Sequence, residues 1–277
     1  MYRIALLLSL LALVLVSCIP AEDPLVFAAV PADDPAIMRA HWQPIVDYLS
    51  GGLDREIELY LVPDYAAQVE AFRAGHVDFG RIGSSSYVIA QRDGVEIEPI
   101  ASAVKEITNV PGYYSYIIAR ADSGIETMDD LHGRTFAFVD VQSSSGYVVP
   151  MCAIKQAGIE LGREFMSGSH EASVLAVQNG TVDAAAVAQI RYYAALEERV
   201  IDVDEFRVIW QSALIPNVPI VVQSSMGVEL KKELQDLFID MPIELVRGPS
   251  RAGEIKYVEI TDAHYDVIRE IEAFLNK

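Results

Sequence analysis

Short apolar runs alternate with amphipathic, helix-like stretches along most of this chain, and that alternation restricts its fold more than any other feature. Strands that alternate with helices are typical of α/β proteins, in which helices cover the faces of a sheet. The pattern therefore predicts an α/β fold with mostly parallel sheets and helices on both faces. The expected strands are 25–30, 57–62, 76–82, 114–120, 134–140, 182–187 and 206–210, and the expected helices include 36–49, 66–74, 146–157 and 170–179.

The body of the chain is long for one core of this kind, so we expect two lobes. The segments 114–122 and 214–224 are extended, and both are candidates for strands that cross from one lobe to the other as a hinge. With two crossings the first lobe is discontinuous. We expect it to comprise residues 25–115 and 225–277, and the second lobe to comprise residues 116–224.

The N-terminus has the shape of a signal peptide. Residues 4–16 are apolar except for Ser9, follow Arg3, and are too few to span a bilayer comfortably. The residues 15–18 resemble a bacterial lipobox, in which the cysteine is acylated. We therefore expect residues 1–17 to be a lipoprotein signal peptide, Cys18 to be lipidated, and residues 18–24 to be a tether. A short membrane anchor and ordinary secretory cleavage remain alternatives.

Charge and cysteine content exclude several classes of protein. The chain has 21 basic and 40 acidic residues, a net charge of −19, which repels the phosphates of nucleic acids. Cys18 and Cys152 are the only cysteines, so there is no disulfide scaffold and no cluster with metal-ligand spacing. We expect no metal, no cofactor and no nucleic-acid partner. The GxSxG, HExxH, P-loop and GxGxxG motifs of common enzymes are absent, which makes enzymatic activity a minority hypothesis.

Serine-rich turns between a strand and a helix are the best candidates for a binding site. One comprises Ser143, Ser144 and Ser145, at the start of a helical run where unpaired N–H groups and the helix dipole favour an anion. A second comprises Ser84, Ser85 and Ser86 and follows the expected strand 76–82. Each turn also fits a simple helix cap without a ligand. Two such turns, one in each lobe, favour an anion site in the cleft between the lobes.

A histidine precedes another predicted helix. His170 can donate a ring N–H to an oxyanion, and it fits equally well a helix cap or a surface histidine.

Several ordered blocks of this chain resemble the extracytoplasmic solute-binding proteins of ABC transporters for phosphonate, phosphite and related oxyanions. The blocks are 62–83, 111–118, 130–150, 168–187 and 212–222, of which 130–150 matches a family motif that contains the serine turn. The resemblance implies a two-lobed periplasmic-binding-protein fold, type II-like, an ABC permease as partner, and export to the bacterial cell envelope. It implies that the ligand contacts Tyr65, Tyr113, Ser143, Ser144, Ser145 and His170.

The chain departs from the family at two positions. In members that bind aminoethylphosphonate, two acidic residues hold the ammonium group of the ligand, and these positions align with Ile190 and Val218 here. The resemblance therefore implies a small phosphorus oxyanion without an amine, such as phosphite, phosphate or methylphosphonate. Gln189 and Arg191 flank Ile190, and a slip of one residue in the alignment would bring either into the site.

Neutral hydroxyl and amide dipoles are expected to bind the anion at contact distance, because the negative charges of the surface are screened. A different hypothesis is a sensor subunit that reports an oxyanion, such as arsenite, to a membrane histidine kinase. Cys152, the thiol that remains after Cys18 is lipidated, makes a thiol-seeking ligand conceivable. An enzyme acting on phosphonates is a third hypothesis.

Overall fold

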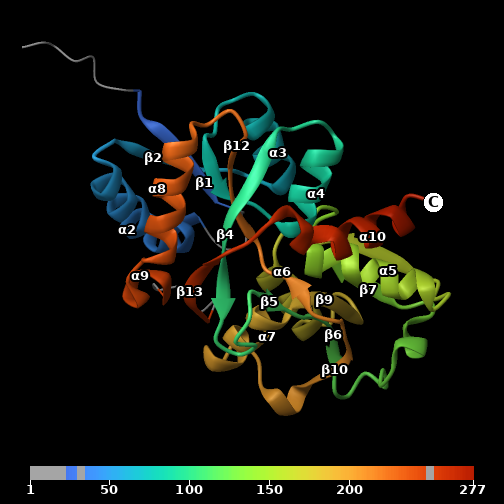
Figure 1. Ribbon diagram of the computed structural model, residues 1–277. Helices are drawn as coiled ribbons and strands as arrows, with labels where there is room; N and C mark the ends of the chain where they lie inside the picture. Colours follow the sequence, from blue (N-terminus) through green and yellow to red (C-terminus); the bar gives the residue numbers. More distant parts are fainter. Residues whose placement is uncertain (1–22, 30–34, 248–252) are drawn as a thin grey trace, which may run out of the picture.

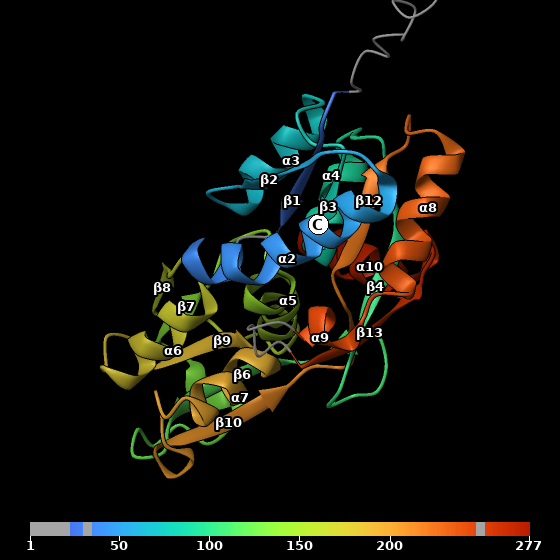
Figure 2. The same cartoon turned by 90° about the vertical axis from the view of Figure 1, so that its left-hand side faces the viewer.

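A computed structural model describes residues 23–29, 35–247 and 253–277. The predicted signal peptide, the lipidation site Cys18 and most of the tether lie outside these residues. Within the described ranges no helix combines the length and the apolar character that a membrane span requires. The described chain forms two lobes, each with its own sheet, and a short connecting ribbon (Figures 1 and 2).

The first lobe is built on a six-stranded sheet in the order β13-β4-β12-β3-β1-β2. β1 pairs in parallel with β2 and β3, whereas β12 runs antiparallel to β3 and β4, and β13 runs antiparallel to β4. The strands are β1 (Leu25–Ala29), β2 (Ile57–Leu61), β3 (Phe79–Arg81), β4 (Ile97–Lys105), β12 (Pro219–Gln223) and β13 (Glu254–Glu259).

Helices cover both faces of this sheet, as the sequence predicts. Trp42, Ile45 and Phe238 belong to the core on one face, and Phe72 and Tyr87 belong to the core on the other. The helical elements of the lobe are α2 (Pro35–Leu53), α3 (Tyr65–Arg73), α4 (Ser84–Arg92), α8 (Val228–Ile239), α9 (Ile243–Arg247), η4 (Asp262–Tyr265) and α10 (Asp266–Leu275).

The second lobe has a five-stranded sheet in the order β10-β6-β9-β7-β8, with a separate apolar core on each face. Its strands are β6 (Ser115–Arg120), β7 (Thr135–Phe138), β8 (Arg163–Met166), β9 (Ala184–Ala188) and β10 (Phe206–Gln211). Its helical elements are η1 (Met128–Leu131), η2 (Ser144–Val148), α5 (Val149–Gln156), α6 (His170–Gln178), α7 (Gln189–Glu197) and η3 (Val203–Glu205).

The two-lobed α/β architecture confirms the predicted fold class, but the sheets are mixed rather than mostly parallel. In the second lobe β7 pairs in parallel with β8 and β9, while β6 runs antiparallel to β9 and β10. The reason is the double crossing between lobes. A chain that enters or returns from the other lobe reaches the sheet from the opposite end, and it then pairs in the antiparallel direction.

The hinge is shorter than the sequence predicts. Its two strands are β5 (Gly112–Tyr113) and β11 (Ile215–Pro216), which pair antiparallel. Residues 219–223, which the prediction assigns to the second lobe, form β12 and pair in the sheet of the first. The prediction placed the boundary too late because the chain is extended on both sides of the crossing, so 214–224 reads as one segment.

The C-terminal helix α10 touches both lobes. It packs against α4 in the first lobe and α5 in the second, and Figure 1 shows it between these two helices. Leu275, its last residue, packs against the second-lobe core that contains Met151 and Ile154. The element that ends the described chain therefore adds a contact between lobes beside the hinge.

Candidate functional site

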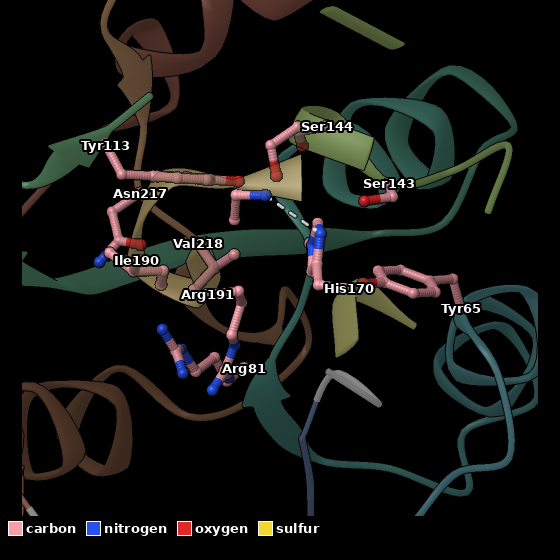
Figure 3. Close-up of a pocket in the computed structure, with 13 residues that line it drawn as sticks. Tyr65, Arg81, Tyr113, Ser143, Ser144, His170, Ile190, Arg191, Asn217 and Val218 are labelled. Atoms are coloured by element: carbon pink, nitrogen blue, oxygen red, sulfur yellow. Dashed lines mark hydrogen bonds between the residues drawn. The ribbon is translucent and has the colours of Figure 1, made fainter. Parts of the chain in front are cut away.

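A small cavity lies between the lobes, next to the hinge (Figure 3). Its volume is about 50 Å³. This volume holds roughly four water molecules, the same number as the four substituents around the central atom of a tetrahedral oxyanion. The residues that line it come from both lobes and from the hinge: Tyr65, Arg81, Gly83, Tyr113, Ser143, Ser144, Ser145, His170, Ala188, Ile190, Arg191, Asn217 and Val218.

The serine turn at 143–145 begins an irregular helix. The Ser143 side chain caps it by accepting a hydrogen bond from the Gly146 N–H at 3.1 Å. Pro150 has no N–H to donate to the Gly146 carbonyl, which instead accepts from the Val139 N–H at 3.0 Å. The first turn is π-helical, because the Val148 N–H donates to the Ser143 carbonyl five residues earlier, at 3.0 Å. Ser143, Ser144 and Ser145 of this turn line the cavity. This arrangement suits an anion.

His170 supplies a neutral N–H donor. Its Nδ1 accepts a hydrogen bond from the Ala188 N–H at 3.1 Å, so the ring proton resides on Nε2. Burial, with a smaller effect of Arg191, lowers the pKa of His170 to about 3. The imidazole is therefore uncharged at neutral pH. Since His170 lines the cavity, its Nε2–H is available to an oxygen of the ligand.

Two tyrosines place hydroxyl groups at the same cavity. Tyr65 is the first residue of α3, which Asp64 caps by accepting from the Ala67 N–H at 2.7 Å. Tyr113 lies in the hinge strand β5. Burial raises the pKa of both phenols, so both stay protonated and can donate. The hydroxyl of Ser143 interacts with Tyr65.

The cavity brings together the six ligand residues that the resemblance implies: Tyr65, Tyr113, Ser143, Ser144, Ser145 and His170. The second serine turn is different, because Ser84, Ser85 and Ser86 do not line the cavity. The Ser84 hydroxyl donates to the Pro216 carbonyl at 2.8 Å, and the Ser85 N–H donates to the Ser144 Oγ at 2.9 Å. These serines join the lobes and the hinge instead of lining the site.

Gln189 is also outside the cavity. Its Nε2 donates to the Tyr116 hydroxyl at 3.0 Å, inside the second lobe. Gln189 is the first residue of α7, and a step of one or two residues along a helix turns a side chain by 100° or 200°. Arg191, two residues further on, lines the cavity, together with Ile190.

Sequence reasoning missed Arg81 and Asn217 as site residues. Arg81 ends β3, and Asn217 follows the hinge strand β11, so neither lies in a motif with an obvious chemical signature. Sequence reasoning pointed to neutral dipoles, and the structure adds two guanidinium groups to the lining of the cavity. The end of β3 was a signal that could have pointed to Arg81, because strand ends in α/β folds commonly carry ligand residues.

The described residues contain no cluster of candidate metal ligands. In the part of the chain that the structure describes, no group of three His, Cys, Asp or Glu side chains is placed to hold a metal ion. Cys152 lies buried in α5 and is not part of the cavity lining, and burial raises the pKa of its thiol.

A cavity of this size between two α/β lobes, lined by hydroxyl, imidazole and guanidinium donors, defines the class of two-lobed solute-binding proteins. The chain matches the family described as "ABC transporter, phosphonate, periplasmic substrate-binding protein" over residues 27–265. The chain belongs to this family. Its members are the substrate-binding components of ABC transporters and are not enzymes. The protein is therefore a periplasmic protein that binds a phosphonate-type compound.

Individual relatives agree with this assignment. The phosphate-import protein PhnD of Mycolicibacterium smegmatis is 27% identical, and the alignment covers 90% of this chain and 85% of that protein. A binding protein component of an ABC phosphonate transporter from Pseudomonas aeruginosa superposes with a TM-score of 0.81 at 26% identity, over 91% of this chain and 87% of that one. PhnD1 from Prochlorococcus marinus, solved in complex with methylphosphonate, has a TM-score of 0.82 at 22% identity, over 91% and 98%.

Proposed function

We propose that this protein captures a small phosphorus oxyanion without an amine, such as phosphite, phosphate or methylphosphonate, between its lobes and delivers it to an ABC permease. The observation that carries the proposal is the lining of the cavity. It combines hydroxyl and imidazole donors with two arginines, and it contains no carboxylate among the described residues. The M. smegmatis relative, a phosphate importer by name, supports the same ligand class.

An amine on the ligand would be poorly accommodated. Ile190 and Val218, at the positions where aminoethylphosphonate-binding members carry acids, both line the cavity. An ammonium group there would lose its water without gaining a counter-charge, and Arg81 and Arg191 would repel it. Burial of an unpaired charge costs several kcal/mol. The site therefore favours ligands that are anionic and have no cationic end.

The available donors are sufficient for tight binding. A hydrogen bond to a charged group contributes about 1.5–3 kcal/mol. Five or six of them offset desolvation and the cost of association, and leave about 8–12 kcal/mol, which corresponds to micromolar to nanomolar affinity.

The proposed cycle is a hinge motion about the ribbon of β5 and β11. In the open form the second lobe moves away and exposes the cavity. In the closed form the Ser85 N–H meets the Ser144 Oγ at 2.9 Å, and the Ser86 hydroxyl reaches the Gln142 carbonyl at 3.4 Å. A ligand held by both lobes stabilises the closed form, and the closed form docks on the permease.

Isothermal titration calorimetry against phosphite, phosphate, methylphosphonate and aminoethylphosphonate tests the proposal. We expect at least one of the first three to bind with a Kd in the micromolar range or below, and aminoethylphosphonate to bind at least about a hundredfold more weakly, equivalent to about 2.7 kcal/mol. Tight binding of aminoethylphosphonate would contradict the reasoning from Ile190 and Val218.

We also propose that Cys18 is lipidated and holds the protein at the cell envelope. The support is the sequence of residues 15–18 after an apolar stretch of signal-peptide length. Metabolic labelling with a radioactive fatty acid should mark the wild type, and the Cys18→Ala variant should lose the label. A wild-type protein without label would rule out the lipid anchor.

A further inference from the structure

The cavity contains charged side chains that the hydroxyl site does not explain. Arg81 comes from the first lobe and Arg191 from the second, and both line the cavity. Figure 3 shows both arginines at one end of the residue cluster, away from Ser144. Both charges act on the buried His41 and on Lys105, so the two guanidinium groups lie in the same region.

Arg81 is held from behind by a buried ion-pair network. Its Nη2 lies 2.5 Å from the Glu254 Oε1, and the Lys105 Nζ lies 2.6 Å from the same oxygen. The side chains of Lys105 and Glu254 are 0% and 1% exposed. The Arg81 guanidinium also lies 5.7 Å from the centre of the Trp42 ring. These contacts fix where the guanidinium sits, and Glu254, Lys105 and Trp42 act as positioning residues.

One carboxylate serves two cations in this network, so the three described residues keep one net positive charge. Burial tends to raise the pKa of Glu254, but the charges of Arg81 and Lys105 lower it to about 2. Burial lowers the pKa of Lys105 to about 8, while Glu254 opposes that shift, so Lys105 remains a cation at neutral pH. His41 adds no charge there, because burial lowers its pKa to about 4.

One N–H group of Arg81 has no acceptor among the described residues. Its Nε is buried and has no hydrogen-bond partner among the described residues. A buried guanidinium N–H without an acceptor is costly in a folded protein. An oxygen of the ligand in the adjoining cavity would satisfy both this donor and the excess positive charge.

We infer that Arg81, positioned by Glu254, selects the charge of the ligand, so that the cavity prefers doubly charged tetrahedral oxyanions to singly charged ones of the same shape. The inference rests on the proposed function and refines its ligand class. The hydroxyls, the imidazole and the serine turn recognise tetrahedral oxygens and serve either charge state. A second negative charge on the ligand pairs with the guanidinium of Arg81, which lines the cavity and has a buried N–H without an acceptor among the described residues.

Methylphosphonate and methanesulfonate form a matched pair of probes. Each has one methyl group and three oxygens on a tetrahedral centre, but ionised methylphosphonate carries two negative charges and methanesulfonate carries one. Just below the pKa of Lys105, which is about 8, part of the methylphosphonate carries two negative charges while the network keeps its positive charge. At this pH we expect the wild type to bind methylphosphonate at least about a hundredfold more tightly than methanesulfonate.

The Arg81→Gln variant should reduce this preference. It leaves Glu254 paired with Lys105, so the network becomes neutral. We expect the affinity for methylphosphonate to fall by about tenfold or more and the affinity for methanesulfonate to change by less than about threefold. Arg81→Lys keeps the charge without the forked geometry and should restore part of the preference. Arg207→Gln is the control. It removes the same unit of positive charge, but at the surface, where Arg207 pairs with Glu126.

Two results would overturn the inference alone: a wild type that binds both probes equally, or an Arg81→Gln variant that keeps the full preference. In either case methylphosphonate still binds and the proposed function stands. If phosphite, phosphate and methylphosphonate all fail to bind the wild type, the proposed function fails, and the inference fails with it. The wild-type comparison needs no variant, so it decides the question even if a substitution prevents folding.

Discussion

At the scale of single residues, the site depends on which atoms donate. His170 is instructive because its Nδ1 is already occupied by the Ala188 N–H, which leaves one donor for the ligand. The serines of the 143–145 turn likewise make hydrogen bonds within the protein. The Ser143 oxygen accepts from the Gly146 N–H and its hydroxyl also interacts with Tyr65, whereas the Ser144 oxygen accepts from the Ser85 N–H of the other lobe and its hydroxyl interacts with Tyr113.

The His170→Asn variant separates the two roles of the imidazole. An asparagine oxygen can replace Nδ1 as the acceptor for the Ala188 N–H, but nothing replaces the Nε2–H. We expect the affinity for the phosphorus oxyanion to fall by about 1.5–3 kcal/mol, measured by calorimetry, with the fold retained. His76→Asn, on the exposed surface of the first lobe, should leave affinity unchanged. Equal affinities of wild type and H170N would remove His170 from the binding site.

The serine turn makes a second prediction. Replacing Ser143 or Ser145 with alanine should weaken ligand binding by more than about tenfold, since a hydrogen bond to a charged ligand is lost. Ser50→Ala is a suitable comparison, because the Ser50 hydroxyl bonds only the Arg55 carbonyl, at 2.6 Å, and does not line the cavity. If S145A and S50A behave alike in titrations, the turn does not contact the ligand.

At the scale of elements, the shape of the turn before α5 depends on a glycine. A Cβ on Gly146 would lie 2.5 Å from the Val139 side chain and 2.8 Å from the Ser143 Oγ, the cap of the same turn. The turn can therefore hold its serines at the cavity only if this position has no side chain.

The Gly146→Ala variant should lose both stability and affinity. We expect unfolding to become easier by about 1–3 kcal/mol from the steric clash, and binding to weaken because the displaced Ser143 no longer faces the ligand. Gly51→Ala provides the contrast. Gly51 lies inside α2 with open space around it, so an alanine there should stabilise the protein by about 0.5–1 kcal/mol. Chemical denaturation and titration of both variants test this, and a G146A protein with wild-type affinity would contradict it.

At the scale of the whole molecule, two buried neutral histidines make stability depend on pH. Burial lowers the pKa of His41 to about 4 and that of His170 to about 3, whereas an unfolded histidine titrates near 6.5. Between about pH 4 and 6.5 the unfolded chain therefore binds protons that the folded chain does not. The free energy of unfolding should fall as the pH falls, by about 1.4 kcal/mol per pH unit for each histidine.

Urea unfolding at a series of pH values between about 7 and 5 measures this slope. Glu254, whose folded-state pKa is about 2, keeps its charge throughout this window and does not contribute. The His41→Gln variant should lose about half of the pH dependence. A variant with the same slope as the wild type would show that other groups take up the protons.

The sequence by itself determined the local elements and part of the candidate site. The predicted strands and helices are present, since alternating apolar runs, caps and glycines act over a few residues. It also pointed to the serine turn and His170, which begin helices, and to Tyr65 and Tyr113 through the family blocks. The longest strand, β4, was missed because Pro99 interrupts its pattern, and the register of β4 against β12 shifts at that point.

Only the tertiary structure decided the order of the strands in the mixed sheets, the short hinge and the charged side of the cavity. Arg81, Arg191 and Asn217 meet because the chain crosses between lobes twice and the lobes close on each other. Glu254 reaches Arg81 across 173 positions of sequence. No local pattern encodes such distant contacts, because they depend on how whole lobes pack and not on the preferences of neighbouring residues.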